Sequence, residues 1–346
     1  MRITLTSFLI VTAAVAASAE PAKAPASDAK AKTTVAQSNT APSANSLTTG
    51  ATLPATPAAA TAPAATPPAP PATSPAPLAS KGATCTNPDA LGVARTVEID
   101  TTGGPGFGME QYKAYDFLEA KEVVLTFDDG PQVRTTRAIL DALQAECAKA
   151  IFFSIGKMAV GMPEIIRDVA HRGHTVGTHT WSHADIRKKP EQEGKDEIEK
   201  GISGVRRAVG GPIAPFFRYP YLRDSPESLK HFASRNIAIF STDIDSFDFK
   251  VQTPEHLVKS IMGKLEKKGK GIILMHDIQP HTAKAIPLLL AELKKGGYKI
   301  VHMKGSSELK TLADYDAMIE KDVKGLPSPG SERPVSSVVK TVPSTP

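Results

Sequence analysis

Residues 123–131 read VVLTFDDGP, an apolar run that ends in two adjacent carboxylates and a Gly-Pro turn. The apolar run is typical of a buried strand, and the turn can aim Asp128 and Asp129 into one cleft. Two carboxylates this close repel each other unless one binds a cation and the other acts as a base. The alternative interpretation is a solvent-exposed acidic turn, so the function of this stretch depends on what the rest of the chain supplies.

A pair of histidines follows about fifty residues later, in the run HTWSH from His179 to His183. Because these two residues are four positions apart, one helical turn or a tight loop can aim both imidazoles at a single ion. Two histidines and one aspartate suit zinc and its first-row neighbours, and they leave coordination positions open. An open position is typical of a catalytic rather than a structural metal site.

Segments typical of strands and helices alternate from about Asp89 to Met303. The predicted strands cover residues 123–127, 151–155, 175–178, 215–218, 237–242, 272–276 and 299–302. The predicted helices include residues 136–146, 191–209, 254–267 and 283–295. This alternation predicts parallel βα units and therefore an α/β fold. Seven such units can close into an irregular βα barrel, and an open doubly wound sheet is the alternative.

Polar side chains gather at the ends of five predicted strands. They are Asp128 and Asp129, then His179 and His183, then Arg218 to Tyr221, then Asp243, Asp245 and Asp248, and finally His276 and Asp277. In a βα barrel the carboxyl ends of the strands form one face, where active sites are built. The sequence therefore predicts a single active site on that face.

The two ends of the chain differ in composition from the predicted barrel. An apolar stretch over residues 8–17 and the small residues Ala17-Ser18-Ala19 predict a secretory signal over residues 1–19, with an uncleaved anchor as the alternative. Residues 20–82 are rich in Ala, Pro and Thr without an aromatic residue, which predicts a disordered linker. We expect the folded domain over residues 83–304 and a flexible tail over residues 305–346.

An exported chain can form disulfides. Its two cysteines, Cys85 and Cys147, are expected to pair in an oxidising compartment and to join the segment entering the domain to the end of its first helix. We expect a periplasmic or secreted protein without a transmembrane span once the signal is cleaved. The net charge of +5 comes without interleaved aromatic and basic residues, so nucleic acid is not an expected partner.

The five clusters and their order resemble the polysaccharide deacetylase family, which is carbohydrate esterase family 4 with its NodB homology domain. The resemblance covers residues 120 to 303. The matching motifs are residues 126–131, 179–183, 218–221, 245–249 and 274–277. The family fold is a distorted (β/α)7-type barrel, in agreement with the alternation of strands and helices.

The resemblance implies a catalytic centre with a divalent metal. Its implied ligands are Asp129, His179 and His183, and its implied metal is zinc, with cobalt, nickel or manganese as alternatives. Asp128 would be the general base that takes a proton from water. His276 would be the general acid that protonates the departing amine, and Asp248 would hydrogen-bond behind it.

The resemblance also implies residues that orient the reaction and bind the substrate. Arg218 would pair with Asp128, and the backbone N–H of Tyr221 would stabilise the oxyanion. Trp181 and Leu274 would shape the pocket for the acetyl methyl group, although a plain packing role for Trp181 is an equal alternative. Phe249 stands where the family commonly has Trp, which bears on substrate shape rather than on the reaction.

These residues favour a metal-dependent hydrolase that removes N-acetyl, or alternatively O-acetyl, groups from an envelope or extracellular polysaccharide. Peptidoglycan is the favoured substrate. One alternative is a non-catalytic glycan-binding envelope protein, which would be expected to have lost a ligand or the base. Another alternative is a hydrolase acting on a non-glycan amide, which would share nearly all of the site chemistry.

Overall fold

The computed structural model describes residues 86–324 with the exception of residue 252. The predicted signal over residues 1–19 and the predicted linker over residues 20–82 lie outside the described residues. Cys85 and the end of the predicted tail, residues 325–346, also lie outside them. The signal, the linker and the pairing of Cys85 with Cys147 therefore stay predictions.

Seven strands of the described chain form a parallel barrel. They are β3 (Glu122–Asp128), β4 (Ile151–Ser154), β5 (Thr175–Thr178), β6 (Phe216–Arg218), β7 (Ala238–Phe240), β8 (Ile244–Asp245) and β9 (Gly271–His276). Because β3 pairs with both β4 and β9, the sheet runs β8-β9-β3-β4-β5-β6-β7. Within the described residues no ladder joins β7 to β8, so the barrel keeps one unpaired seam. The predicted α/β fold with a distorted barrel is confirmed.

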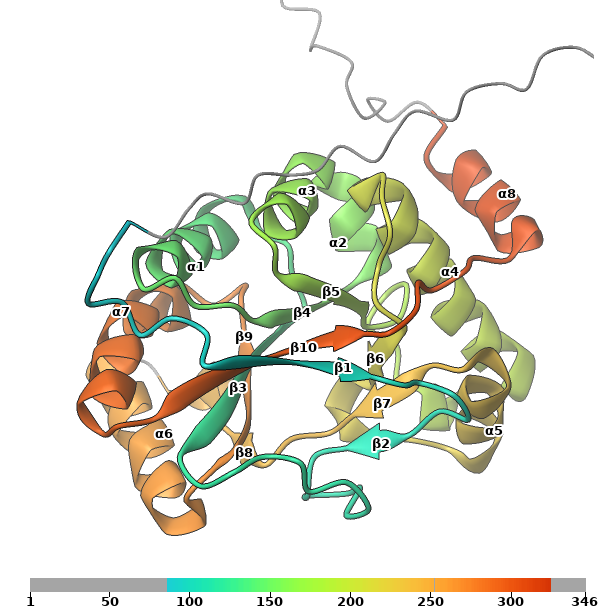
Figure 1. Cartoon of the computed structure of the whole chain (residues 1–346). Helices are drawn as coiled ribbons and strands as arrows, with labels where there is room; N and C mark the ends of the chain where they lie inside the picture. Colours follow the sequence, from blue (N-terminus) through green and yellow to red (C-terminus); the bar gives the residue numbers. More distant parts are fainter. Residues whose placement is uncertain (1–85, 252, 325–346) are drawn as a thin grey trace, which may run out of the picture. The chain divides into compact units, whose positions relative to one another are not determined.

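Three further strands extend the sheet outside the barrel: β1 (Arg95–Ile99), β2 (Gly106–Phe107) and β10 (Lys299–Gly305). β10 pairs with β1, and it reaches β3 only at Glu122 and Val123, where that strand begins. The pair β1–β10 therefore lies at the amino ends of the barrel strands (Figure 1). The predicted seventh strand, 299–302, is thus not a barrel strand. That position belongs to β8, whose two residues are too few to give a periodic signal in the sequence.

Helices surround the barrel strands (Figure 1). They are α1 (Val133–Ala145), α2 (Gly156–Gly161), α3 (Pro163–His171), α4 (Glu191–Val209), α5 (Pro226–Arg235), α6 (Pro254–Lys268) and α7 (Pro280–Lys295), with 3-10 turns η1 (Ile186–Lys188), η2 (Pro220–Leu222) and η3 (Asp248–Lys250). The side chains of Ser225 and Thr253 cap α5 and α6, each of which starts with a proline. None of the helices in the described part of the chain is long and apolar enough to cross a membrane.

The alternation of side chains along β3 explains how a polar site can sit on an apolar barrel. Val124 belongs to the buried cluster inside the barrel, whereas Leu125 and Phe127 belong to the cluster between the barrel and its helices. Because successive side chains of a strand point to opposite faces, Thr126 and Asp128 continue the inner row that starts with Val124. The last residue of β3 therefore points into the barrel mouth.

The chain remains folded beyond the predicted domain end at residue 304. Helix α8 (Ala313–Asp322) buries Tyr315 and Ile319, and Arg207 of α4 pairs with Glu320 at 2.6 Å. The expectation of a flexible tail from residue 305 is therefore corrected for this helix. Its physical reason is the four-residue spacing of the two buried side chains, which places both on one helix face.

Candidate active site

The turn after β3 directs two adjacent carboxylates into one cavity. Asp128 ends the inner row of β3, and Asp129 adopts a φ of 78°, which turns the chain back towards the same cavity. Gly130 follows, where an added Cβ would lie 2.0 Å from a carboxylate oxygen of Asp277. Only glycine therefore allows this turn to pack on the buried Asp277, whose carboxylate accepts a hydrogen bond from Thr136.

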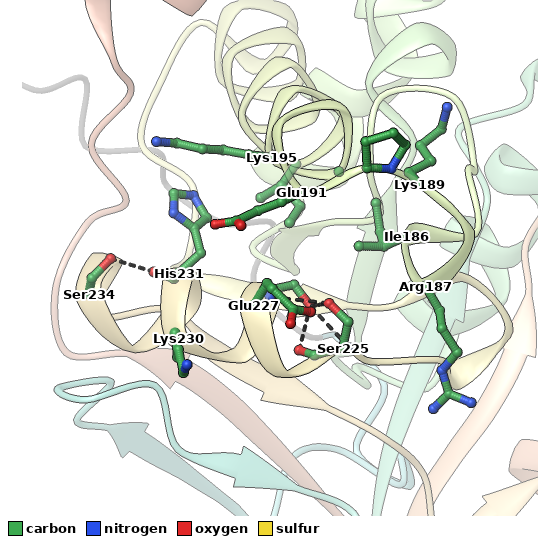
Figure 2. A pocket seen from close by; sticks show the side chains of 14 residues that line it. Ile186, Arg187, Lys189, Glu191, Lys195, Ser225, Glu227, Lys230, His231 and Ser234 are labelled. Carbon is green, nitrogen blue, oxygen red and sulfur yellow. Dashed lines mark hydrogen bonds between the residues drawn. The ribbon is translucent and has the colours of Figure 1, made fainter.

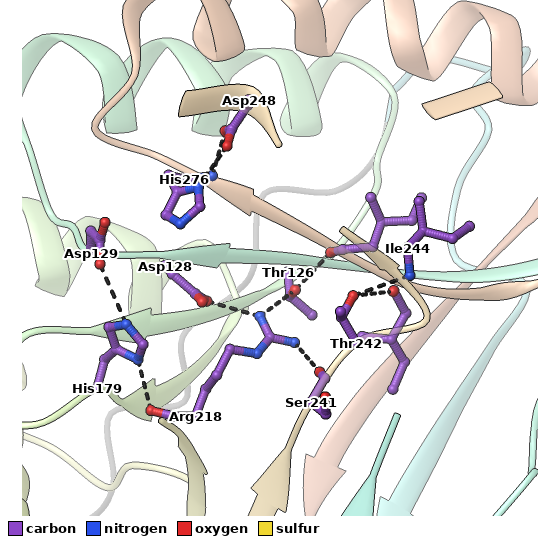
Figure 3. Close-up of polar contacts among 12 residues, drawn as sticks. Thr126, Asp128, Asp129, His179, Arg218, Ser241, Thr242, Ile244, Asp248 and His276 are labelled. Atoms are coloured by element: carbon purple, nitrogen blue, oxygen red, sulfur yellow. Dashed lines mark hydrogen bonds and ion pairs between the residues drawn. The ribbon is translucent and has the colours of Figure 1, made fainter. Parts of the chain in front are cut away.

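Asp129, His179 and His183 bring their side chains together as a candidate metal site. One ligand atom from each residue lies within 4.8 Å of the others. The Nε2 atoms of His179 and His183 lie 3.4 Å and 3.3 Å from Asp129 Oδ1. His179 Nδ1 contacts the carbonyl oxygen of Arg218 at 2.7 Å, which directs Nε2 to the centre of the group (Figure 3).

The state of these side chains fits a bound cation. Asp129 Oδ1 is buried. Within the described part of the chain it forms no hydrogen bond, although the two imidazoles lie close to it. Burial alone would raise the pKa of Asp129, but the three neighbouring histidines lower it to about 2. Burial lowers the pKa of His183, with the charge of His179 acting in the same direction. An ionised carboxylate and neutral imidazoles are the forms that bind a metal.

Arg218 holds Asp128 in place from inside the barrel. Its Nη1 donates to Asp128 Oδ1 at 2.8 Å and to Thr126 Oγ1 at 2.6 Å, and its Nη2 donates to the carbonyl of Ser241 at 2.8 Å. The guanidinium lies 4.5 Å from the centre of the Phe153 ring. Arg218 is fully buried and Asp128 nearly so. This is a buried ion pair in which Thr126 and the carbonyl of Ser241 accept further hydrogen bonds from the guanidinium, so the position of Arg218 is strongly fixed.

His276 ends β9, the strand next to β3, and contacts Asp248. Its Nδ1 lies 2.6 Å from Asp248 Oδ1, and its backbone N–H donates to Asp248 Oδ2 at 2.7 Å (Figure 3). Thr282 also donates to Asp248 Oδ2. Burial alone would lower the pKa of His276, but the bond to Asp248 and the nearby carboxylates raise it to about 9. The imidazole is therefore protonated at neutral pH.

One cavity of about 400 Å³ lies at the carboxyl ends of the strands. It is lined by Asp128, Asp129, His179, His183 and His276. Leu274 and Tyr221 also line it, and the Tyr221 ring lies 4.9 Å from that of His183. Tyr221 has a φ of 59°, so its backbone leaves the regular path of the 3-10 turn η2. A larger hollow of about 760 Å³ lies elsewhere, between the start of α4 and α5 (Figure 2). None of the strand-end residues lines this larger hollow. The larger volume therefore does not mark the candidate active site.

Trp181 does not line this cavity, which corrects the expected role in the acetyl pocket. Its ring lies against Gly156 of α2 and Gly204 of α4, where an added Cβ would approach it to 2.6 Å and 2.8 Å. Its backbone N–H donates to Glu197 of α4. The alternative packing role therefore fits the position of Trp181, and two glycines of neighbouring helices provide the space.

Some partners of the site could not be assigned from the sequence. Thr126, Thr282 and the carbonyl of Ser241 hold the charged side chains in place. For Thr126 a signal existed, because it lies two residues before Asp128 on the same strand face. Asp245 of the fourth strand-end cluster lines the cavity, and so does Phe247, which the sequence presents only as part of the motif 245–249.

Comparisons with known proteins agree with this fold and identify a family. A family model described as polysaccharide deacetylase matches residues 117–238. A peptidoglycan-N-acetylglucosamine deacetylase of Bacillus cereus is 32% identical over 201 residues, which are 56% of this chain and 71% of that protein. A chitooligosaccharide deacetylase of Bradyrhizobium sp. is 28% identical over 199 residues, covering 54% of this chain and 90% of that one.

A solved structure is also similar, that of the Bdellovibrio bacteriovorus peptidoglycan deacetylase Bd3279. It is 33% identical with a TM-score of 0.56, and the match covers 62% of this chain and 59% of that chain, less than two thirds of its length. The fold and these matches define an enzyme built on a βα barrel. The chain belongs to the polysaccharide deacetylase family, as the resemblance of its motifs predicted, and is an enzyme of that class.

Proposed function

We propose that this protein is a metal-dependent deacetylase that removes N-acetyl groups from a cell-envelope polysaccharide, with peptidoglycan as its substrate. The observation that carries the proposal is one cavity lined by three potential metal ligands, by the carboxylate of Asp128 that Arg218 binds and by the imidazole of His276 that Asp248 binds. A carboxylate that accepts a proton and a protonated imidazole that delivers one are the two groups that amide hydrolysis requires. The names of the relatives support an acetylated glycan as the substrate.

The donor set of Asp129, His179 and His183 suits zinc. A zinc ion held by these residues would polarise the acetyl carbonyl and lower the pKa of a water molecule. The chain's own residues supply the proton transfers. The carboxylate of Asp128 accepts a proton from the attacking water, while its bond to Arg218 keeps the carboxylate aimed into the cavity.

His276 supplies the second proton transfer. Because its Nδ1 faces Asp248, its Nε2 is the atom that delivers a proton to the amide nitrogen as the carbon–nitrogen bond breaks. The products are acetate and a free amine on the sugar. Leu274 lines the cavity as an apolar wall suited to the acetyl methyl group, and the backbone N–H of Tyr221 is the proposed donor to the oxyanion.

The proposed place of action follows from the substrate. Peptidoglycan lies outside the cytoplasm, so we propose that the protein is exported to the periplasm or secreted, as the predicted signal over residues 1–19 suggests. The predicted linker over residues 20–82 would then allow the barrel to reach a meshwork-like substrate.

The test is acetate release from acetylated glycans by the purified full-length chain, with zinc and after chelation. We expect zinc-dependent release that falls by about three orders of magnitude in Asp128→Asn, because this change removes the base and keeps the side-chain volume. Unchanged release by Asp128→Asn would contradict the mechanism. Zinc binding without release from any glycan would favour the alternatives, a glycan-binding protein or a hydrolase of another amide.

A further inference from the structure

The active-site cavity continues into a second hollow on one side. This neighbouring hollow of about 360 Å³ shares three lining residues with the cavity: Leu222, Asp245 and Phe247. Gln111 and Lys264 line its far part. A glycan is a chain of sugars, so a sugar held at the catalytic centre has a neighbour that must lie in one of the adjoining hollows.

Two exposed phenylalanines mark the passage between the two hollows. Phe247 is 40% exposed and Phe249 is 52% exposed, with ring centres 6.1 Å apart. Phe249 also lies edge-on to the imidazole of His276, at 5.7 Å between ring centres. Exposed apolar side chains at the rim of a cavity are typical of a ligand-binding groove. Phe247 lines both hollows, and Phe249 lines the catalytic cavity beside His276.

The lysines around this passage carry charge that the chain does not neutralise. The Nζ atoms of Lys264 and Lys250 lie 4.6 Å and 4.8 Å from the centre of the Phe247 ring, and Lys250 lies 5.3 Å from that of Phe249. Lys264 donates to the neutral carbonyl oxygen of Asp245. Among the described residues no carboxylate lies within ion-pair distance of Lys250 or Lys264.

Lys250 lies over the two phenylalanine rings beside the hollows, and Lys264 lines the second hollow. The other charged residues that line the second hollow already have partners. Lys268 pairs with Glu110 at 3.0 Å. The carboxylate of Asp243 accepts hydrogen bonds from the backbone N–H groups of Met109 and Ile272. The carboxylate of Asp245 accepts one from the N–H of Phe247. The ammonium groups of Lys250 and Lys264, which form no ion pair within the described residues, are therefore available to an anionic group of the substrate, and Lys264 keeps its bond to the carbonyl of Asp245.

We propose that Lys250 and Lys264 form a subsite for a carboxylate carried by the sugar next to the one that is deacetylated. This inference rests on the proposed function and makes it more specific, because the subsite would select acidic glycans over uncharged ones. A muramic acid residue whose stem peptide has been removed carries such a carboxylate on its lactyl group, whereas chitin-type chains carry none. Lys250 and Lys264 are thus specificity-determining residues for the same reaction.

The test compares two substrates of equal length with the full-length zinc-loaded enzyme. One is a peptidoglycan tetrasaccharide with free lactyl carboxylates, and the other is uncharged chitotetraose. The measured quantity is the ratio of their kcat/KM values for acetate release. We expect this ratio to fall about fivefold in Lys250→Met and on the order of tenfold when Lys264→Met is added. The ratio in the unsubstituted enzyme should also fall as salt is raised.

Two further variants keep the result interpretable. Lys267→Met removes a lysine from the same helix as Lys264, but Lys267 neither lines a hollow nor lies over the rings of Phe247 and Phe249, so the ratio should not change. Lys250→Glu changes an exposed side chain and should lower the ratio more than Lys250→Met, even if the Lys264 variant folds poorly. A ratio that stays constant in Lys250→Met and Lys250→Glu overturns the subsite. Release from neither substrate overturns the proposed function itself.

Discussion

The most informative prediction concerns the bond between His276 and Asp248, because this bond controls the protonation of His276, the proposed general acid. We consider Asp248→Asn, which removes the charge and leaves a side chain of almost the same shape. The pKa of His276 is about 9 against an ordinary value of 6.5. At about 1.36 kcal/mol per pKa unit this difference corresponds to about 3.4 kcal/mol in favour of the protonated imidazole.

The sign of the change follows from the opposing influences on His276. Burial lowers its pKa, whereas Asp248 and, more weakly, Asp128 and Asp129 raise it. Without the charge of Asp248 we expect the pKa to fall to about 7 or lower. At pH 8 a pKa of about 9 leaves about nine-tenths of the imidazole protonated, and a pKa of about 7 leaves about one-tenth. The variant should thus lose about tenfold in kcat/KM at pH 8 and regain much of it at pH 6.

The assay is an NMR titration of the imidazole nitrogens in metal-free protein, followed by the pH dependence of acetate release. A bound divalent cation would lower the pKa of His276 in both proteins, so their difference is the quantity to measure. Asp245→Asn serves as the control, because it removes a carboxylate of the same cavity without breaking the bond to His276. A pKa of His276 that stays near 9 in Asp248→Asn would refute the reasoning.

Three other predictions concern the metal, the buried ion pair and the acidic turn. Asp129→Ala should abolish zinc binding in calorimetry, whereas Asp128→Asn should still bind zinc without turnover; equal zinc affinity in both would contradict the ligand assignment. Arg218→Met should lower the free energy of unfolding, measured in urea, by about 3–5 kcal/mol, because it leaves the buried carboxylate of Asp128 unpaired. The exposed Arg134→Met is the control, and an equal loss of stability in that variant would contradict this explanation. Gly130→Ala should cost about 1–3 kcal/mol, because its Cβ meets a buried carboxylate, and an unchanged thermal midpoint would show that the turn can shift.

The barrel could be predicted because its strands are short apolar runs that end in polar residues. The predicted strand over 175–178 and the predicted helix over 191–209 agree with β5 and α4. β8 could not be predicted, because two residues carry no periodicity. α8 could have been found from Tyr315 and Ile319, but the Pro- and Ser-rich composition that follows it obscured the signal.

The geometry of the site was predictable only where it depends on the ends of strands. Residues that end barrel strands, such as Asp128, Arg218 and His276, must meet at one face whatever the detailed packing. The direction of a loop side chain depends instead on its neighbours. Trp181 lies between the two histidines in sequence, yet it points to the helices because Gly156 and Gly204 leave space there. Only the three-dimensional arrangement supplies that information.

The position at which the chain enters the barrel has a practical consequence. The side chain of Asn87 and the N–H of Gly92 donate to the carbonyls of Ala145 and Glu146, at the end of α1. Since α1 connects two parallel strands, its end lies beside the amino ends of the strands, away from the cavity. If an enzyme is attached to a bead or surface immediately before residue 86, its open face would therefore point outward. Immobilisation from that side should leave an insoluble polymer free to reach the catalytic groups.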